Sequence, residues 1–341
     1  MMTPIVFDGS VLGAGPLTGV GGSFLSSLEA YVPIAEQPCV LLLPQVGADA
    51  EAIRGRIPDL RVERVLPGGW IRRRRCLRRF TRQTNAVLFH APVVALPGRL
   101  ACPAVATVHD LPWLHPELRG EPGTRWSQRL ALRRALRTAD ALIVPSEATR
   151  RDLLRSSRCN PRVEVIRHGV SWPTEAAADS TPDRPFLVLG DNRPRKNLGR
   201  LRAAHAIARS RCADLPALRF IGPDHDYVGE AEKWSILRSS RALLHVALFE
   251  GFGLPVLEAF AHGVPVVCGN QSSLPELAGE AALAVDPHNV DAIAEAMIQL
   301  HRDAGLRAKL RERGRRRAQE LTPAQSAAGW LRLHTDLIAG R

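Results

Sequence analysis

Aromatic residues are scarce in this chain, at 5% of its 341 positions, although its formal net charge is +12. Basic proteins that read nucleic acid carry a zinc finger, a helix-turn-helix or a sheet with aromatic stacking positions. None of these signatures occurs in the sequence. Nucleic acid is therefore not the partner that we expect.

Closely spaced cysteines are also absent. The chain has six cysteines, and no two of them form a Cys-x-x-Cys pair. Without such spacing, the sequence predicts neither a zinc site nor a disulfide framework. We expect reduced, structural thiols and no metal ligands among the following residues: Cys39, Cys76, Cys102, Cys159, Cys212 and Cys268.

Long apolar runs are missing as well. No stretch approaches the roughly 18 uninterrupted apolar residues that a membrane-spanning helix requires. The segment Met1–Asp8 has no basic region followed by an apolar stretch, so it resembles a first buried strand more than a secretion signal. The expected location is the cytoplasm.

The composition that remains is that of a globular protein, with 45% apolar and 23% charged residues. Strand-like apolar runs alternate with helix-length segments along nearly the whole chain, which predicts an α/β protein with parallel sheets covered by helices. The predicted strands are 4–8, 38–43, 86–90, 104–108, 141–144, 163–166, 186–190, 218–222, 242–246 and 264–268.

A chain of this length has room for two domains. Apolar periodicity is lost between His168 and Pro185, where proline, serine and alanine accumulate as they do in linkers. We therefore predict a first domain at 1–168, a linker at 169–184 and a second domain at 185–321. The remaining segment, 322–341, has the pattern of an amphipathic helix.

Two carboxylates with seven residues between them, Glu250 and Glu258, flank a Gly-x-Gly turn and a helix start. We predict a helix over 255–262, with Pro255 at its first position, Glu258 in its first turn and Gly263 at its end. The amides near its start suit a phosphate, and the carboxylates suit sugar hydroxyls. The segment thus indicates a sugar attached to a phosphate, although a loop with two solvated acids has the same pattern.

Cationic residues follow the strand predicted at 186–190. The turn Gly190–Asn197 offers Arg193, Arg195 and Lys196, which together can bind a diphosphate. A solvated basic loop is the alternative interpretation.

Earlier in the chain, His109 and Asp110 follow the strand at 104–108, and glycines at 19–22 begin the first helix. Because ligands of such sheets bind at the carboxyl ends of the strands, these residues are further site candidates. A lone histidine in that position is also often structural.

Arginine clusters account for much of the charge, at 72–75 with Arg78, Arg79 and Arg82, and again at 311–317. The first cluster is mixed with apolar residues at helical spacing: Trp70, Ile71, Leu77 and Phe80. It predicts either an amphipathic helix that contacts an anionic membrane surface or a fold helix with a solvated basic face.

Taken together, these segments resemble the retaining glycosyltransferases of the GT-B fold, in the large family that contains many bacterial mannosyl-, rhamnosyl- and N-acetylglucosaminyltransferases. The resemblance spans nearly the whole chain and keeps the order of the family's motifs. The matching segments are Ile5–Gly9, Thr18–Gly21, Thr107–Leu111, Pro145–Leu153, Val165–Val170, Pro194–Leu198, Glu250–Ala259 and Ser273–Ala281.

The resemblance implies two Rossmann-like, doubly wound domains that face each other across a cleft. It implies a nucleoside diphosphate sugar on the C-terminal domain, an acceptor on the N-terminal domain, and a final helix that packs back on the N-terminal domain. It also implies a retaining reaction without a protein nucleophile, a metal or another cofactor.

Catalytic roles carry over to four residues: His109, Arg195, Lys196 and Glu250. Arginine and lysine would neutralise the departing diphosphate, Glu250 would hold sugar hydroxyls, and Glu258 would accept the ribose hydroxyls. The donor contacts implied by the resemblance are Gly21, Gly22, Arg193, Arg195, Lys196, Glu250, Gly251, Phe252, Gly253, Leu254 and Glu258.

Three positions depart from the family pattern. Val246-Ala247 stands where Pro-Ser is common, and Arg193 stands where Glu is common. Only fourteen residues separate Gly222 from Leu237, where relatives carry another strand and loop that help to hold the base.

Two functions follow from these observations. The first is a hexosyltransferase of polysaccharide biosynthesis, with GDP-mannose as the favoured donor and a glycan, lipid-linked or small-molecule acceptor, at work in the cytoplasm or peripherally at the inner face of the plasma membrane. The second is a catalytically degenerate, glycosyltransferase-like scaffold or partner subunit.

Overall fold

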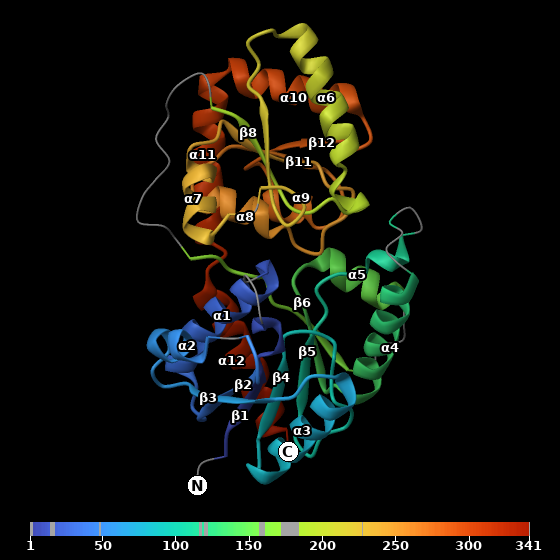
Figure 1. Cartoon of the computed structure of the whole chain (residues 1–341), viewed down its shortest axis with the longest axis vertical. Coiled ribbons are helices and arrows are strands. Elements are labelled where there is room, and N and C mark those ends of the chain that lie inside the picture. The colour runs from blue at the N-terminus through green and yellow to red at the C-terminus, as the bar shows by residue number, and fades with distance from the viewer. Residues whose placement is uncertain are drawn as a thin grey trace. The chain divides into compact units, whose positions relative to one another are not determined.

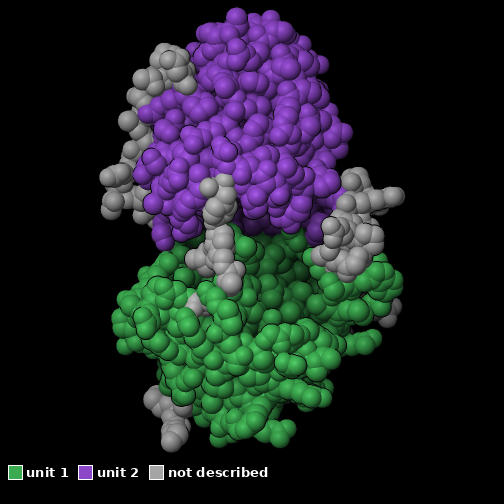
Figure 2. Space-filling model, in the orientation of Figure 1, with its two compact units in different colours: residues 1–111, 121–169, 323–341 green, residues 112–120, 170–322 purple. Residues whose placement is uncertain are grey.

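The computed structural model describes residues 3–13, 18–47, 49–115, 118, 122–156, 161–171, 184–226 and 228–340, with only the backbone for 122–125. The chain forms two compact units (Figure 2). Unit 1 comprises Met1–Leu111, Glu121–Gly169 and Pro323–Arg341, and unit 2 comprises Pro112–Gly120 and Val170–Thr322. Most of the predicted linker, 172–183, lies outside the described residues, as does Cys159.

Unit 1 is built on a parallel sheet of seven strands in the order β3-β2-β1-β4-β5-β6-β7 (Figure 1). In β1, the third strand of this order, Phe7 pairs with Leu41 on one side and with His90 on the other. The strands are β1 (Ile5–Asp8), β2 (Cys39–Pro44), β3 (Arg61–Leu66), β4 (Leu88–Ala91), β5 (Ala104–Thr107), β6 (Ala141–Val144) and β7 (Arg162–Val165).

Helices cover this sheet, and successive residues of its central strands are buried on both faces: Val6 and Phe7 are each 0% exposed. The α-helices are α1 (Gly19–Tyr31), α2 (Ala50–Arg56), α3 (Trp70–Gln83), α4 (Pro122–Thr138), α5 (Glu147–Ser156) and α12 (Pro323–Ala339). The 3-10 helices are η1 (Ser10–Leu12) and η2 (Val32–Ile34).

The last helix, α12, belongs to the core of unit 1 and lies beside α1 (Figure 1). Its Trp330 packs against Phe7, with ring centroids 6.2 Å apart. Its His334 bonds the Tyr31 hydroxyl at 2.8 Å and His90 at 3.1 Å. The amphipathic pattern at the end of the sequence therefore reflects packing onto the first sheet.

Unit 2 is built on a parallel sheet of five strands in the order β12-β11-β10-β8-β9. These are β8 (Phe186–Leu189), β9 (Leu218–Ile221), β10 (Ala242–His245), β11 (Val266–Gly269) and β12 (Leu283–Val285). The helices are α6 (Leu198–Arg211), α7 (Glu230–Arg238), α8 (Leu254–Ala261), α9 (Leu274–Ala278), α10 (Val290–Arg302) and α11 (Ala304–Gln319), with the 3-10 helices η3 (Pro112–Leu114) and η4 (Pro194–Lys196).

Alternate residues of the same strand supply two cores in unit 2. Leu187 and Leu189 of β8 join a cluster with α8 and α9, whereas Phe186 and Val188 join one with α6 and α10. This division follows from the two-residue repeat of a strand. It explains why the strands of this sheet are continuous apolar runs in the sequence.

The predicted strands agree with the structure to within a few residues, and two strands were not predicted. Strand β3 begins with Arg61 and carries Glu63 and Arg64, because it lies at the edge of its sheet and its side chains are partly exposed. Strand β12 has only three residues and also lies at an edge. Neither has the apolar run by which a buried strand is recognised.

Candidate active site

A tight turn after β8 carries the two cationic side chains predicted to bind a diphosphate. It forms η4, and Asn197 closes it in the left-handed conformation with φ of 60°. The side-chain amide of Asn197 donates hydrogen bonds to the backbone carbonyls of Val246, at 3.1 Å, and Pro287, at 2.7 Å. Because both carbonyls follow strands of the same sheet, these bonds fix the turn at the carboxyl end of that sheet.

Two glycines make room for this turn. Gly190 has φ of 139°, and a Cβ atom there would lie 3.2 Å from Cε of Lys196. A Cβ atom on Gly222 would lie 2.0 Å from the Gly190 carbonyl oxygen. Glycine is thus required where the ends of β8 and β9 meet beside the Lys196 side chain.

Glu250 is the centre of a buried charged cluster. Its Oε1 atom lies 2.7 Å from Lys196 Nζ and 3.0 Å from Arg195 Nη1, and its side chain is 9% exposed. Burial raises the pKa of Glu250, but the opposing charges of Lys196 and Arg195 outweigh burial and hold the pKa well below its usual value. The carboxylate is therefore ionised, and the three side chains together carry a surplus positive charge.

His245, at the end of β10, is a member of this cluster that the sequence did not reveal. Its Nε2 donates to Glu250 Oε1 at 3.2 Å. Burial first, and then the nearby charge of Lys196, lower the pKa of His245, so the ring is neutral. A histidine that ends an apolar strand is indistinguishable from a core residue in the sequence.

Two serines hold the backbone of Glu250. Ser272 Oγ accepts a hydrogen bond from the Glu250 amide, and Ser273 Oγ donates one to the Glu250 carbonyl, both at 2.9 Å. Ser272 has φ of 56°, which is uncommon for a residue with a side chain. The only sequence signal for these serines was the matching segment that begins at Ser273.

Close packing explains why the second position of the Gly-x-Gly turn, Gly253, is a glycine. Gly253 has φ of 106°, and a Cβ atom there would lie 2.9 Å from methyl groups of Leu274 and Leu277 of α9. Gly251, Phe252 and Gly253 are all buried. This glycine therefore lets the turn pack closely against α9, besides any contact with a ligand.

Helix α8 begins one residue earlier than predicted, at Leu254, so Glu258 lies in its second turn. The amides of Val256 and Leu257 bond the Gly253 carbonyl at 2.9 and 3.2 Å, and Pro255 has no N–H. The expected row of amides open to an anion is therefore not formed by these three residues. Gly263, with φ of 65°, follows the helix as predicted.

Glu258 lies near the cluster and has a partner of its own. Lys233 Nζ of α7 is 3.3 Å from Glu258 Oε1 and 3.7 Å from the centre of the Trp234 ring. Burial raises the pKa of Glu258, while Lys233 and, at longer range, Lys196 oppose this rise. The shortened segment between Gly222 and Leu237 thus still supplies α7, which delivers a lysine to this carboxylate.

Arg193 does not join the cluster. Its side chain is 62% exposed, and its Nε donates to Asp191 Oδ2 at 2.7 Å. The turn thus separates its three cationic residues: Arg195 and Lys196 contact Glu250, and Arg193 pairs with an acid of the same loop.

In unit 1, His109 belongs to a chain of neutral hydrogen-bonding groups. His109 Nε2 lies 2.7 Å from the Pro92 carbonyl, and its Nδ1 lies 3.2 Å from Nε2 of His168. His168 Nδ1 lies 3.0 Å from Ser23 Oγ. Since a carbonyl can only accept, the protons run in one direction: Ser23 donates to His168, His168 to His109, and His109 to Pro92.

Burial keeps both rings of this chain uncharged. It lowers the pKa of His109, and it lowers the pKa of His168 to about 3. Both ring nitrogens of His109 have protein partners, so proton transfer from this ring to a sugar would require one of these bonds to break. His168 was not predicted as a site residue, although it lies in the matching segment Val165–Val170.

The glycines at the start of α1 lie next to Ser23. Thr18 caps the helix, with its Oγ1 accepting from the Gly21 amide at 3.2 Å and its carbonyl from the Gly22 amide at 2.9 Å. A Cβ atom on Gly22 would meet nothing within 4 Å. Packing among the residues that the structure describes thus gives no reason for glycine at position 22.

Two family profiles match the chain. "Glycosyltransferase Family 4" matches residues 39–171, and "Glycosyl transferases group 1" matches residues 218–317. The first match lies in the part of the chain that forms most of the seven-stranded sheet, and the second contains Glu250 and Glu258.

Curated relatives carry mannosyltransferase names. The chain is 28% identical to the O-antigen chain mannosyltransferase B of Escherichia coli over 275 residues, 69% of this chain and 70% of that protein. It is 27% identical to the MMP alpha-(1->4)-mannosyltransferase of Mycolicibacterium hassiacum over 271 residues, 68% of this chain and 64% of that protein.

Solved structures share the fold at low sequence identity. A sucrose-phosphate synthase from Thermosynechococcus elongatus superposes with a TM-score of 0.80 at 18% identity, covering 99% of this chain and all of that one. WaaG, a glycosyltransferase involved in lipopolysaccharide biosynthesis, gives 0.73 at 14% identity, with 97% and 99% covered. With two doubly wound parallel sheets and both family profiles matched in order, this chain belongs to the group 1 and family 4 glycosyltransferases of the GT-B fold.

Proposed function

We propose that this chain is a retaining, metal-independent hexosyltransferase that moves a mannose-type sugar from a nucleoside diphosphate sugar to a glycan, lipid-linked or small-molecule acceptor. The names of the two curated relatives favour mannose, and GDP-mannose is the first donor to test. A structure of HepE from Anabaena that is similar in fold contains UDP and glucose, so uridine donors belong in the same test.

The observation that carries this proposal is the cluster around Glu250. All three of its side-chain contacts reach Oε1, and no described residue bonds Oε2. That second oxygen can accept hydroxyl groups of a sugar, while the surplus positive charge of Arg195 and Lys196 suits a diphosphate. A sugar and a diphosphate joined by one bond satisfy both halves of the cluster.

The proposed reaction uses this charge when the leaving group departs. The acceptor hydroxyl oxygen forms a bond to the anomeric carbon on the face from which the diphosphate leaves, and its proton passes to the departing phosphate oxygen. Negative charge grows on the diphosphate during this step. Lys196 and Arg195 stabilise the transition state more than the ground state, which is the condition for catalysis.

A thermal-shift panel tests the donor directly, because a ligand that binds only the folded state raises the melting temperature by mass action. GDP, UDP, ADP and dTDP sugars are compared at equal concentration, and the best binder is then assayed for transfer and for hydrolysis. Turnover that falls in a Lys196→Met variant supports the proposal. Binding without any turnover, to water or to a panel of sugar and lipid acceptors, favours the catalytically silent scaffold.

We also propose that unit 1 contacts an anionic membrane surface, which would place the protein at the cytoplasmic face of a membrane. No described helix is long and apolar enough to cross a membrane. Two neighbouring helices instead expose large apolar side chains: Trp70 and Ile71 of α3 are 47% and 61% exposed, and Trp126 and Leu130 of α4 are 65% and 56% exposed. We call these four residues the α3–α4 patch.

Arginines join the two halves of the α3–α4 patch. The guanidinium of Arg134, one turn after Leu130, stacks on the Trp70 ring at 4.3 Å, and that of Arg74 stacks on the same ring at 4.4 Å. Arg75 and Arg78 share a helix face with Ile71 and are exposed. Exposed apolar side chains with cations beside them suit the headgroup layer of an anionic lipid membrane.

Other members of the predicted amphipathic segment are engaged inside unit 1. Leu77 is 1% exposed, Phe80 is partly buried, and Arg73 pairs with the buried Asp8 at 2.5 Å. These residues hold α3 on its sheet. They are therefore unsuitable for a membrane test.

Vesicle co-sedimentation tests the patch. We expect binding to vesicles that contain phosphatidylserine and none to neutral phosphatidylcholine vesicles, and we expect Arg75→Gln with Arg78→Gln to weaken it. Arg313→Gln with Arg316→Gln on α11 removes the same charge elsewhere and is the matched control. Equal loss in both pairs would mean that net charge, and not the patch, governs binding.

A further inference from the structure

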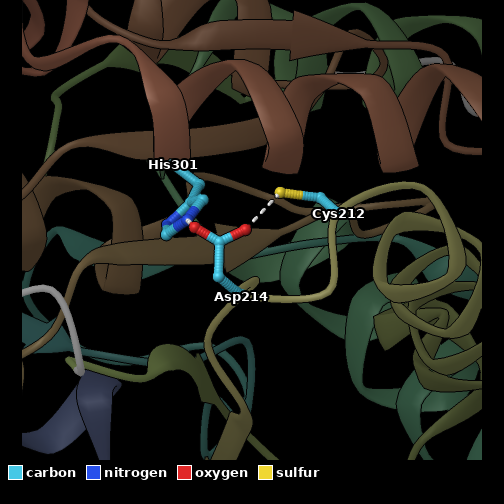
Figure 3. A group of neighbouring side chains, drawn as sticks. All are labelled: Cys212, Asp214 and His301. Atoms are coloured by element: carbon cyan, nitrogen blue, oxygen red, sulfur yellow. Dashed lines mark hydrogen bonds and ion pairs between the residues drawn. The ribbon is translucent and has the colours of Figure 1, made fainter.

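Three side chains of different chemistry meet at the end of α6, at positions where the spacing of the cysteines predicts no metal site. Cys212 caps the carboxyl end of α6, Asp214 follows it in a turn, and His301 lies in the last turn of α10. Figure 3 shows Asp214 between the other two side chains. The sequence has no Cys-x-x-Cys pair, so it predicts no metal site of that kind. The fold nevertheless brings Cys212 and Asp214 next to His301, which is 87 residues from Asp214 in the sequence.

Two donors converge on one carboxylate in this group. Cys212 Sγ donates to Asp214 Oδ1 at 3.1 Å, and His301 Nε2 donates to Asp214 Oδ2 at 3.0 Å. The potential ligand atoms all lie within 4.8 Å of one another. Ligand atoms of a tetrahedral zinc ion are separated by roughly 3.2 to 3.6 Å, as its bond lengths require. Small side-chain rotations would therefore turn the hydrogen-bonded group into a coordination shell.

We propose that Cys212, Asp214 and His301 form a zinc site that ties the ends of α6 and α10 together. The thiolate and the imidazole select a borderline-soft ion such as Zn²⁺ over Mg²⁺ or Ca²⁺. Binding replaces the thiol proton, which is released to solvent, and moves the imidazole proton to Nδ1. One Zn²⁺ entering and one proton leaving convert a group of charge −1 into a neutral one.

The surroundings of the three side chains hold two ligands firmly and leave one adaptable. Cys212 is 3% exposed, and the His301 side chain is 8% exposed. Arg307 Nη1 donates to the carbonyls of Leu300 and His301, both at 2.8 Å, which fixes the last turn of α10. The Asp214 side chain is 82% exposed, so it can rotate, and water can fill a fourth position.

The electrostatics are compatible with metal binding. Hydrogen bonds from His301 and then Cys212 lower the pKa of Asp214 to about 2, so this ligand is ionised at neutral pH. The bond to Asp214 raises the pKa of the Cys212 thiol, and a hydrogen bond from Arg302 opposes this rise. Because zinc binds the thiolate form of cysteine, binding displaces the thiol proton, and we expect tighter binding as pH rises.

This site is independent of the proposed sugar transfer. Lys196 lies just before α6 and Cys212 just after it, and a helix of 14 residues separates them by about 21 Å. Zinc at this distance cannot contact a diphosphate bound at Lys196. Its role would be structural, in holding two helices of unit 2.

Metal titration of the whole, metal-stripped chain tests the inference. We expect one equivalent of Zn²⁺ to raise the melting temperature, and one equivalent of Co²⁺ to give a thiolate-to-cobalt charge-transfer band in the near ultraviolet. Cys212→Ser should abolish the band. Cys76→Ser, which changes a partly exposed thiol on α3, is the matched control and should leave both signals unchanged.

A second variant keeps the test valid if Cys212→Ser fails to fold. Asp214→Asn changes an exposed side chain, and it should weaken zinc binding by more than the roughly 10- to 100-fold that loss of an outer-shell partner costs. A charge-transfer band that persists in Cys212→Ser, or a melting temperature that does not respond to zinc, would overturn the inference. Donor binding measured in the same variants should be unaffected.

Discussion

The candidate site residues of unit 2 are ions, whereas those of unit 1 are neutral rings. Glu250 is held by two cations within 3.0 Å, and their charge keeps it ionised although it is buried. His109 and His168 are half-buried and bond each other, Pro92 and Ser23, and burial keeps them uncharged. Both groups lie at the carboxyl ends of parallel strands. The same position in two similar sheets therefore holds charged side chains in unit 2 and uncharged rings in unit 1.

This difference indicates what each unit is suited to bind. A cluster with surplus positive charge and one open carboxylate oxygen favours an anionic group beside hydroxyls. A chain of neutral hydrogen-bond donors and acceptors orients the group that it binds and adds no net charge. Such a chain suits an uncharged group, for example a sugar or its acceptor. Four predictions test this contrast, and they are ordered by the size of the expected effect.

The largest effect concerns stability. Glu250→Gln leaves Arg195 and Lys196 buried without their counter-ion, so we expect a loss of about 3 to 5 kcal/mol in the free energy of unfolding. Lys196→Met alone leaves a balanced pair of Arg195 and Glu250 and should cost less. In the Glu250→Gln background, Lys196→Met should increase stability, because it removes an unpaired buried charge.

Urea unfolding of the two single variants and the double variant measures these three values. The prediction is wrong if the stability losses of the two single variants add up in the double variant, so that Lys196→Met destabilises both backgrounds. That result would show that Glu250 does not neutralise the charge of Lys196.

The second prediction concerns turnover. If the cluster stabilises the departing diphosphate, Lys196→Met should lower kcat by about 100- to 1,000-fold, as the loss of one preorganised donor does in other enzymes. Arg193→Gln is the control, because Arg193 belongs to the same turn but pairs with Asp191. Equal losses in the two variants would contradict the separation of these cationic residues.

The third prediction concerns pH. The pKa of His168 is about 3 in the folded chain, against a usual value of 6.5, so between these values only the unfolded chain binds this proton. Stability should therefore fall as pH drops below 6.5, by about 1.4 kcal/mol per pH unit for each such histidine. His168→Asn should reduce the slope by that amount.

Glu250 should act in a different pH range. Its folded pKa lies well below the usual 4.5, so its contribution to stability is complete above that pH and is lost as pH falls below it. Glu250→Gln should alter the slope mainly below pH 4.5, whereas His168→Asn alters it between pH 5 and 6.5. Urea unfolding at half-unit pH steps distinguishes the two residues.

The smallest effect concerns positioning in unit 1. His168→Asn removes the ring that donates to His109, and we expect kcat to fall by roughly tenfold, about 1.4 kcal/mol, while KM for the donor changes little. Ser23→Ala, at the far end of the same chain, should have a smaller effect. A large rise in KM with constant kcat would mean that this chain of rings helps to bind the donor.

Much of the fold was predictable because buried parallel strands are continuous apolar runs. Strand β6 agrees with its predicted bounds, 141–144, and β5 and β8 differ by one residue. The edge strands β3 and β12 were missed, since partly exposed strands lose that run. In the site, Arg195, Lys196 and Glu250 were identified from their types and spacing, and the structure brings them within hydrogen-bonding distance.

Other parts of the site depend on contacts between residues that are distant in the sequence. Lys233 bonds the Glu258 carboxylate from 25 residues away, and Ser272 accepts a hydrogen bond from the Glu250 backbone amide from 22 residues away. His245 is only five residues from Glu250, but it reaches the carboxylate because of the way in which the chain turns after β10, and no local pattern encodes this turn. The same holds for the pairing of His109 with His168, 59 residues away. Which cationic residues of the turn contact Glu250 was also undetermined, because Arg193, Arg195 and Lys196 all have the same charge.

By itself, the sequence determined the alternation of strands and helices and the residue types at the strand ends, because both are set by short-range patterns of burial and turn chemistry. Tertiary structure decided which of those side chains meet and which are charged. Those properties depend on distance and burial, and only the packed sheet brings Lys196 to Glu250, or Cys212 to His301, and removes water from around them.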